Sequence, residues 1–381
     1  MNDKIKLKDA CKILNGFAFK SGKYVDSGIR IIRIANVQKG YVEDERPAFY
    51  PNSEESSIRD YMLEEDDLLL SLTGNVGRVA LLDKRWLPAA LNQRVACLRI
   101  KDDRIIKDYL YFALLSDKFE NDCTESSKGI AQKNMSTEWL KDYEIPLPSR
   151  QKQREIISSL KQLSMIIKNK TEQIQQLDDL IKARFVEMFG NNKYETRIIK
   201  DVLCESFWLM PATPKYIDEG IPYITSKNIK NRILNLDDTK FISENDYVKI
   251  SKNRLIKPGD ILVSMIGTLG QTAVVSKDKR FYGQNIYLLR LNNSIINTSF
   301  FCEFFNSDDI QNKLTGKSNQ STQAYLKANH IEELLIPIPP IAVQNDFAVF
   351  VAQVDKSKFA VQKSLEKTQL LFDSLMQEYF G

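Results

Sequence analysis

Four polar residue types gather in short tracts along this sequence, and their chemistry suits the surface of a nucleic acid. Arg and Lys hold phosphates, and Arg, Lys, Asn and Gln pair with base edges through matched donors and acceptors. The tracts contain Lys20, Arg33, Asn36, Gln38, Lys39, Arg78, Asn92, Gln93, Arg94, Lys128, Gln132, Lys133 and Asn134, then Lys227, Asn228, Lys230, Gln271, Gln284, Asn285, Lys317, Asn319, Gln320 and Gln323. We expect these residues to contact DNA; for any single position, a solvated polar loop is the alternative.

Two Gly-x-x-Gly turns lie beside these tracts, at Gly74 to Gly77 and at Gly267 to Gly270. Because glycine has no side chain, the backbone of such a turn can approach a phosphate closely. Taken alone, each turn is explained more simply as a plain hairpin turn. The polar neighbours Arg78 and Gln271, which follow the two turns, favour the phosphate interpretation.

The sequence lacks the short motifs of common enzyme classes. It has no phosphate-binding loop, no dinucleotide-binding Gly-x-Gly-x-x-Gly and no Gly-x-Ser-x-Gly elbow. The single histidine, His330, excludes most His-ligated metal sites and His-containing triads. The one Asp-x-Lys pair, Asp238 to Lys240, lies in a polar loop. We therefore expect no catalysis, no metal and no cofactor bound by this chain.

Composition is that of an ordinary globular protein with 381 residues, 43% hydrophobic and 27% charged. The net charge of +4 is too small to indicate a polyanionic partner without clustering. The five cysteines, Cys11, Cys97, Cys123, Cys204 and Cys302, form no Cys-x-x-Cys pair, which favours free thiols in a reducing compartment. No apolar run is long enough to span a membrane, so we expect a cytoplasmic protein.

The elements that carry the polar tracts occur twice in the same order. Alternating strands such as GIRIIRIANV, DLLLSLTG and RVACLRI precede an amphipathic helix in IIKDYLYFALLSDKFENDC, and GIPYITSKNI, DILVSMIG and YGQNIYLLRL precede NTSFFCEFFNSDDIQNKL. Asp67 matches Asp260, 193 residues on, and Arg99 matches Arg290, 191 residues on. Gln93 is likewise paired with Gln284. We predict an α+β protein with two similar mixed domains, built from one ancestral unit.

Each copy ends in a long helix. The first runs from Gln151 to Gly190, without proline or glycine before its end, and would be about 60 Å long. Its seam alternates in steps of four and three, the 3.5-residue period of a coiled coil: Ile156, Leu160, Leu163, Ile167, Lys170, Ile174, Leu177, Ile181, Arg184 and Met188. A second seam lies 191 residues on: Phe347, Val351, Val354, Lys358, Val361, Leu365, Thr368, Phe372, Leu375 and Tyr379.

We predict that the two helices pair antiparallel within the chain and relate the domains by a pseudo-twofold axis, because their seams match in length. The predicted divisions are residues 1–150, 151–190, 191–340 and 341–381. Pairing between two chains is the alternative.

The whole chain resembles the specificity subunit of type I restriction–modification enzymes. The stretches that carry this resemblance are SLTGNVGRVALL, AALNQRVACLRI and KGIAQKNMSTEWLKDYEIPLPSRQKQREI, with VSMIGTLGQTAVV, GQNIYLLRL and EELLIPIPPIAVQNDF in the second copy. NGFAFKSGKY resembles the opening motif of the family. Its counterpart SFWLMPATPKY departs from that motif, losing the glycine and carrying Trp208 and Met210.

The resemblance implies two target-recognition domains, each reading one half of a bipartite double-stranded DNA site. The helix pair would set the spacer and dock two modification (methyltransferase) subunits, joined by restriction (helicase–nuclease) subunits. S-adenosylmethionine, ATP and Mg would then be bound by those partners. The role of the whole complex would be defence against foreign DNA. A scaffold that docks proteins through its helices is the runner-up interpretation, and a self-contained nuclease–methylase is the third.

Overall fold

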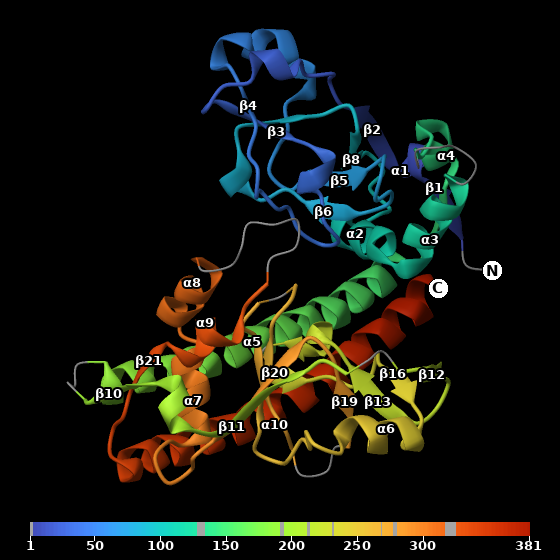
Figure 1. Ribbon diagram of the computed structural model, residues 1–381. Helices are drawn as coiled ribbons and strands as arrows, with labels where there is room; N and C mark the ends of the chain where they lie inside the picture. Colours follow the sequence, from blue (N-terminus) through green and yellow to red (C-terminus); the bar gives the residue numbers. More distant parts are fainter. Residues whose placement is uncertain are drawn as a thin grey trace. The chain divides into compact units, whose positions relative to one another are not determined.

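The computed structural model describes residues 3–127, 134–190, 194–211, 214–230, 232–267, 269–276, 280–316 and 325–381. The chain forms two compact units, each combining small sheets with helices (Figure 1). Unit 1 contains Met1–Thr171 and Gln362–Gly381, and unit 2 contains Glu172–Val361. The predicted mixed α and β architecture is confirmed, and both long helices are present, each starting in one unit and ending in the other.

Unit 1 is built on a four-stranded antiparallel sheet, in the order β2–β8–β5–β6, and a three-stranded sheet, in the order β4–β3–β7. Its strands are β1 (Lys4–Lys6), β2 (Cys11–Asn15), β3 (Ile29–Ile32), β4 (Phe49–Tyr50), β5 (Leu68–Ser71), β6 (Val79–Leu81), β7 (Ala89–Leu91), β8 (Val95–Ile100) and β9 (Glu144–Pro146). Its helices are α1 (Leu7–Ala10), α2 (Lys107–Leu115), α3 (Asp117–Ser126) and α4 (Thr137–Asp142), with 3-10 turns at Ser21–Lys23, Ile34–Asn36, Asn52–Tyr61 and Lys84–Trp86.

Unit 2 repeats the four-stranded sheet as β11–β20–β17–β18 and has a second sheet, β12–β16–β13–β19. Its strands are β10 (Thr196–Ile198), β11 (Leu203–Leu209), β12 (Tyr216–Ile217), β13 (Ile221–Ile224), β14 (Ile229–Lys230), β15 (Ile233–Leu234), β16 (Lys240–Ile242), β17 (Ile261–Ser264), β18 (Thr272–Val274), β19 (Tyr282–Gly283), β20 (Ile286–Leu291) and β21 (Leu335–Pro337). Its helices are α6 (Glu244–Ser251), α7 (Thr298–Phe305), α8 (Asp308–Gly316) and α9 (Ala328–Glu332), with 3-10 turns at Ile199–Val202 and Ser226–Asn228.

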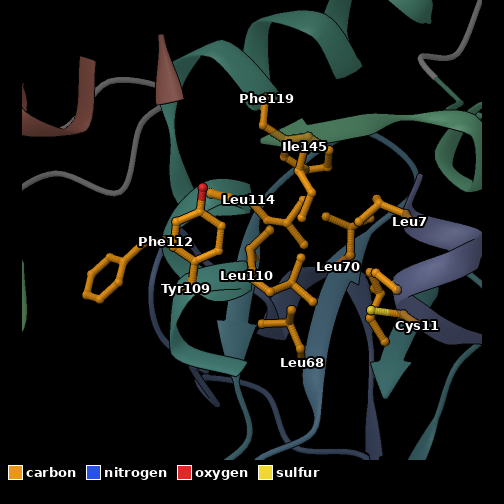
Figure 2. Packing of buried hydrophobic residues seen from close by; sticks show 14 of the residues in the cluster. Leu7, Cys11, Leu68, Leu70, Tyr109, Leu110, Phe112, Leu114, Phe119 and Ile145 are labelled. Carbon is orange, nitrogen blue, oxygen red and sulfur yellow. The ribbon is translucent and has the colours of Figure 1, made fainter. Parts of the chain in front are cut away.

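Each four-stranded sheet has an inner strand, β5 in unit 1 and β17 in unit 2, that is buried on both faces. We call it the central strand, and its burial explains its unbroken apolar run. In unit 1, Leu68 and Leu70 of β5 face α2, where Leu110 packs against them (Figure 2). Leu69, between them, belongs to the cluster that the second sheet covers. Strand β17 in unit 2 divides its side chains between two clusters in the same way.

A buried ion pair fixes the central strand to its neighbour at the same place in both units. Asp67 accepts two hydrogen bonds from Arg99, at 2.8 and 2.7 Å, and Asp260 accepts two from Arg290, at 2.8 Å each. Both carboxylates are almost fully buried. These pairs raise the pKa of both guanidinium groups, chiefly through the side-chain hydrogen bonds to Asp67 and Asp260.

A buried glutamine fixes the start of each long helix to the domain before it. Helices α5 (Arg150–Phe189) and α10 (Ile341–Phe380) have 40 residues each. Gln153 accepts from the backbone N–H of Ile106 at 2.9 Å, and Gln344 accepts from that of Asn297 at 2.8 Å. Each amide also donates to two backbone carbonyls, so neither buried glutamine has an unsatisfied side-chain atom.

Within each unit the two long helices pack antiparallel. In unit 1, Ile156 and Leu160 of α5 share a core with Met376 and Phe380 at the end of α10. In unit 2, Ile181 and Phe189 at the end of α5 share a core with three residues near the start of α10, namely Phe347, Val351 and Val354. All twenty seam positions are buried or half-buried. The charged seam residue Lys358 pairs with Asp178 of α5 at 2.5 Å.

Candidate nucleic-acid interface

Beyond one end of the four-stranded sheet of unit 1, backbone hydrogen bonds tie four loop segments into a row. Gln93 N donates to Phe17 O at 3.0 Å, Leu72 N donates to Arg94 O at 3.0 Å, and Met135 N donates to Leu72 O at 2.9 Å. We call the segments 17–18, 93–94, 72–73 and 134–135 the loop row of unit 1. The row continues the strand order β2–β8–β5, so the sheet fixes where each loop emerges.

Unit 2 has the same row. Asn285 N donates to Leu209 O at 2.9 Å, Met265 N donates to Asn285 O at 3.4 Å, and Leu326 N donates to Met265 O at 2.9 Å. The loop row of unit 2 therefore consists of residues 209–210, 285, 265–266 and 325–326. The two rows have equivalent backbones, although the sequences of these loops differ.

The loop row corrects the predicted alignment of the repeats at one point. Asn92 N donates to the end of β3 at 3.2 Å, and Gln284 N donates to the end of β13 at 3.1 Å. Gln284 is therefore the counterpart of Asn92, whereas the sequence alignment paired it with Gln93. Asn285 alone makes the two row bonds that Gln93 and Arg94 share in unit 1, and it adopts a φ of 61°. A turn shortened by one residue explains the shift.

The side chains of the two rows differ in chemistry. Unit 1 presents Thr73, Gln93, Arg94 and Asn134, all polar and at least half-exposed except Thr73, which is partly buried. Gln93, Arg94 and the nearby Lys20 have no side-chain partner among the residues that the structure describes. At the equivalent places of unit 2 stand Ile266, Asn285 and Tyr325. Of the predicted contact residues, the row of unit 1 contains Gln93, Arg94 and Asn134, with Asn92 directly beside it. The row of unit 2 contains Asn285, with Gln284 directly beside it.

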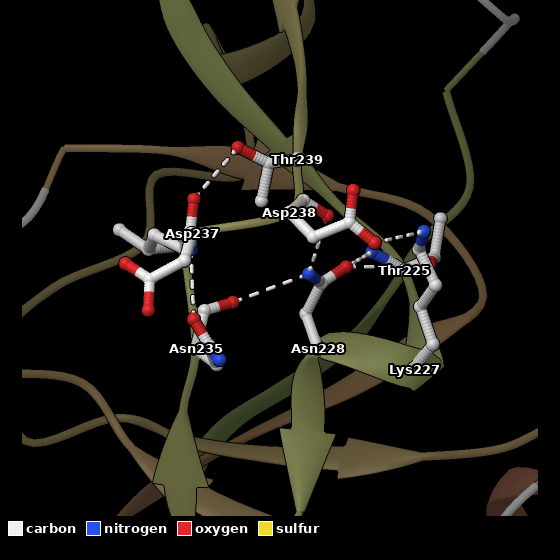
Figure 3. A network of polar contacts seen from close by, with 8 residues as sticks. Thr225, Lys227, Asn228, Asn235, Asp237, Asp238 and Thr239 are labelled. Carbon is white, nitrogen blue, oxygen red and sulfur yellow. Dashed lines mark hydrogen bonds and ion pairs between the residues drawn. The ribbon is translucent and has the colours of Figure 1, made fainter. Parts of the chain in front are cut away.

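The buried asparagines Asn36 and Asn228 have a structural role, which corrects their prediction as DNA contacts. The Asn36 side chain accepts from Arg33 N at 2.9 Å and donates to Glu43 O at 2.9 Å. The Asn228 side chain accepts from Thr225 N at 2.9 Å and donates to the carbonyls of Asn235 and Asp238 (Figure 3). Each asparagine closes the loop that follows a parallel strand, and its side chain is almost fully buried, so the amide serves the protein backbone.

Several other predicted contacts have protein partners. Lys39 binds Asp117 at 2.6 Å and Glu120 at 2.8 Å; burial lowers the pKa of Lys39, but the bonds to these carboxylates more than offset that effect and raise it overall. Lys227 pairs with Asp238 at 3.3 Å on an exposed surface.

Arg33, Gln38 and Arg78 form hydrogen bonds close to the loop row of unit 1. Arg33 donates to the carbonyl of Arg46, and Arg78 donates to the side chain of Gln38. In unit 2, the Tyr223 hydroxyl donates to Gln284 at 3.4 Å, and burial raises the pKa of this tyrosine. Gln271 is half-buried after its Gly-x-x-Gly turn. These side chains are oriented by the protein before any ligand binds.

The two Gly-x-x-Gly turns are hairpins stabilised by the preceding serine, and their second glycines meet a helix. Ser71 accepts from Arg78 N at 3.0 Å, and Ser264 accepts from Gln271 N at 2.9 Å. A Cβ on Gly77 would lie 2.9 Å from the Cβ of Cys123 in α3. Gly77 is therefore required for close packing, whereas a Cβ on Gly270 would meet only the side-chain ends of Gln311 and Leu314. Both turns fit the simpler hairpin interpretation. Gly267 has no atom within 4 Å of an added Cβ among the described residues.

Eight predicted contacts are not covered by these observations. Lys128, Gln132, Lys133, Lys317, Asn319, Gln320 and Gln323 lie outside the described residues, and the Lys230 side chain does as well. The structure adds positions that the sequence analysis missed, namely Thr73 in unit 1 and Met210, Ile266 and Tyr325 in unit 2. The departure of SFWLMPATPKY from its counterpart was the signal for Met210; nothing in the pattern indicated Ile266 or Tyr325.

The described residues offer neither a metal site nor a reactive thiol at the loop rows. No group of three or more metal-ligating side chains occurs among them. Burial raises the pKa of the Cys11 and Cys302 thiols to about 12. Cys204 alone is exposed, at the irregularity between Leu203 and Glu205 in β11. No helix in the described part of the chain is long and apolar enough to cross a membrane.

Comparison with known proteins places both units in one family. The sequence model for the type I restriction modification DNA specificity domain matches twice, at residues 2–178 and 191–370. The EcoBI specificity subunit of a type I restriction enzyme from Escherichia coli is 22% identical over 96% of this chain and 80% of its own length. The MjaVIII specificity subunit from Methanocaldococcus jannaschii is 27% identical over 46% of this chain and 42% of its own length. A crystal structure of a type I restriction-modification S subunit from M. genitalium shares the fold, with a TM-score of 0.59, 16% identity and coverage of 100% of this chain and 96% of that one.

Proposed function

Because this chain belongs to the family of type I restriction modification DNA specificity domains, we propose that it is the DNA-recognition subunit of a type I restriction–modification complex. Each unit reads one half of a bipartite DNA site with the side chains of its loop row. The single observation that carries this assignment to the loop rows is their construction: equivalent backbones, rigidly tied to the sheet, present different side chains. Such an arrangement suits two readers of different sequences.

The side chains of the loop row in unit 1 have the chemistry that base reading requires. Arg94 and Gln93 can each form paired hydrogen bonds with a base, to guanine and adenine respectively. Both are exposed, and the row fixes their backbones through bonds of 3.0 Å. Lys20 is exposed nearby and supplies charge for a phosphate. The side chains of Arg33, Gln38 and Arg78 bond to other protein groups beside the row. They would hold the loops in place without contacting a base.

The paired helices would hold the two readers at a set spacing and dock two methyltransferase subunits, with restriction subunits completing the complex. We propose no catalysis for this chain itself; S-adenosylmethionine, ATP and Mg would be bound by the partners. The family membership favours this function over a protein scaffold that binds no DNA, because both units match a DNA specificity domain.

Methylation mapping tests the proposal. In cells that express the chain with its methyltransferase, replacing residues 1–150 by the same domain of a relative should change one half of the methylated sequence and leave the other half unchanged. A chain with residues 191–340 replaced serves as the reciprocal control. Methylation that is unaffected by both replacements would contradict DNA recognition by this chain, and changes in both half-sites at once would contradict the modular reading.

A further inference from the structure

The side chains of the loop row of unit 2 are more apolar than those of the loop row of unit 1. Met210 is 61% exposed and follows the buried Leu209, and Tyr325 is 36% exposed and precedes the buried Leu326. Their counterparts by backbone position are Ala18 and Asn134. Ile266, partly buried, stands where unit 1 has Thr73. Three positions of an otherwise equivalent row have therefore become more apolar.

These residues form one surface, because the row fixes their order. Ile266 and Tyr325 are direct antiparallel neighbours, and Asn285 bonds to Leu209, the residue before Met210, at 2.9 Å. Neighbouring segments in such a row are about 4.8 Å apart. Four segments thus span roughly 15 Å, on the order of four base steps of 3.4 Å. One amide, that of Asn285, lies among the apolar groups.

Cationic side chains adjoin this surface. Arg254 is exposed and donates to the carbonyl of Trp208 at 2.7 Å, two residues before Met210. Lys327 is exposed two residues after Tyr325. An apolar centre with cations on its flanks complements a DNA groove, in which base edges lie between two rows of phosphates. A purely apolar protein partner would gain nothing from the flanking charges.

We propose that the loop row of unit 2 recognises the C5-methyl groups of thymines in the major groove, whereas the row of unit 1 recognises its half-site by hydrogen bonds. This inference rests on the proposed function. The thymine methyl is the apolar group that the major groove presents, and apolar side chains contact it directly. Met210 is flexible and polarizable and can adapt to such a group. Asn285 is able to pair with the adenine of a neighbouring base pair.

Replacing thymine by uracil, which removes only the methyl group, tests the proposal on the complete complex with its methyltransferase subunits. The domain replacements described above first assign each half-site to a unit. In the half-site of unit 2, each contacted thymine changed to uracil should weaken DNA binding about fourfold, the equivalent of one buried methyl group. The same changes in the half-site of unit 1 should alter binding less than about twofold.

Two variants connect the effect to the row. Met210→Gln keeps the length of the side chain but adds an amide, and Ile266→Thr introduces the residue of unit 1; each should reduce the discrimination between thymine and uracil. Ile233→Thr, at an exposed isoleucine of β15 outside the loop row, is the matched control and should preserve it. Unfolding temperatures of all three proteins distinguish lost contacts from lost structure.

A unit 2 half-site without an A·T pair would overturn the proposal, as would equal tolerance of uracil in both half-sites. Either result would leave the proposed DNA-recognition function intact, since binding would still depend on sequence. Conversely, loss of all dependence on this chain would overturn the proposed function itself. The two failures are therefore distinguishable.

Discussion

The loop rows of the two units share every backbone bond that defines them but no outward-facing side chain. Thr73, Arg94 and Asn134 in unit 1 correspond to Ile266, Asn285 and Tyr325 in unit 2. The residues that are identical in the two copies lie elsewhere, among the buried polar side chains that hold each unit together. We call these side chains the frame. Asp67 and Arg99, for example, are matched by Asp260 and Arg290, and each carboxylate accepts two hydrogen bonds from its arginine.

This contrast separates two kinds of polar residue. Where both copies keep the same polar side chain, as at Asn36 and Asn228 or Gln153 and Gln344, it is buried and bonded to backbone. Where the copies differ, the side chain faces outward. In this repeated chain, identity between the copies therefore indicates the frame, and difference indicates the loop rows that we propose to read DNA.

The largest effect should come from breaking the frame, and it should be equal in both units. Asp67→Asn and Asp260→Asn each leave a partly buried guanidinium without its main partner, which should lower the free energy of unfolding by about 3 kcal/mol. Calorimetry or urea unfolding measures the loss. Asp66→Asn, at the neighbouring carboxylate that pairs with Lys107 on the surface, should cost less than about 1 kcal/mol. A large difference between the Asp67 and Asp260 variants would contradict the equivalence of the frames.

The second effect distinguishes the second glycine of the Gly-x-x-Gly turn in unit 1 from the first glycine of the turn in unit 2. Gly77→Ala should destabilise unit 1 by about 3 kcal/mol, because the residue has a φ of 83° and its Cβ would overlap Cys123. Gly267→Ala has a similar φ, 81°, but open space, and should cost only about 1 kcal/mol. Unfolding of both variants in urea gives the comparison. Equal losses would show that backbone conformation alone, without helix packing, requires these glycines.

A third comparison sets a row residue against a frame residue, both of which the sequence analysis predicted to contact DNA. Arg94→Ala should weaken DNA binding by the complex about tenfold and leave unfolding unchanged, since the side chain has no partner among the described residues. Asn36→Ala should instead cost about 2 kcal/mol of stability, because it leaves buried backbone groups unpaired. Fluorescence anisotropy and thermal unfolding separate these outcomes. Weaker binding by Asn36→Ala at temperatures where it is fully folded would return Asn36 to the contact set.

The smallest change concerns the helices that connect the readers. Insertion of four residues into both α5 and α10, at the boundaries Thr171/Glu172 and Val361/Gln362, adds about one turn, roughly 5 Å. The recognised spacer should lengthen by about one or two base pairs, with both half-sites unchanged. Long-read methylation mapping measures the spacer. Insertion into α5 alone, which offsets the seams, is the control and should reduce stability; an unchanged spacer in the double insertion would limit the helices to a structural role.

Much of the fold was predictable because it depends on patterns along the chain. The 3.5-residue seam indicated both long helices. None of their observed ends differs from the predicted end by more than one residue. The strands of the repeat, such as Leu68–Ser71 and Ile261–Ser264, were visible as apolar runs. The candidate contact residues were less predictable, because a buried asparagine that closes a loop and an exposed asparagine have the same local sequence signal. Asn36 and Asn134 illustrate the two cases.

The sequence by itself determined the duplicated architecture, the two long helices and the family, because periodicity and repeat order are properties of the chain. The tertiary structure decided that the helices pair within the chain, where residues of both helices share a core. Only the tertiary structure decided which polar residues belong to the frame and which to the loop rows. Burial and hydrogen-bond partners come from segments far apart in sequence, as when Leu72 joins Arg94 and Met135. The same long-range bonds revealed that Met210, Ile266 and Tyr325 share one surface, which no local pattern contains.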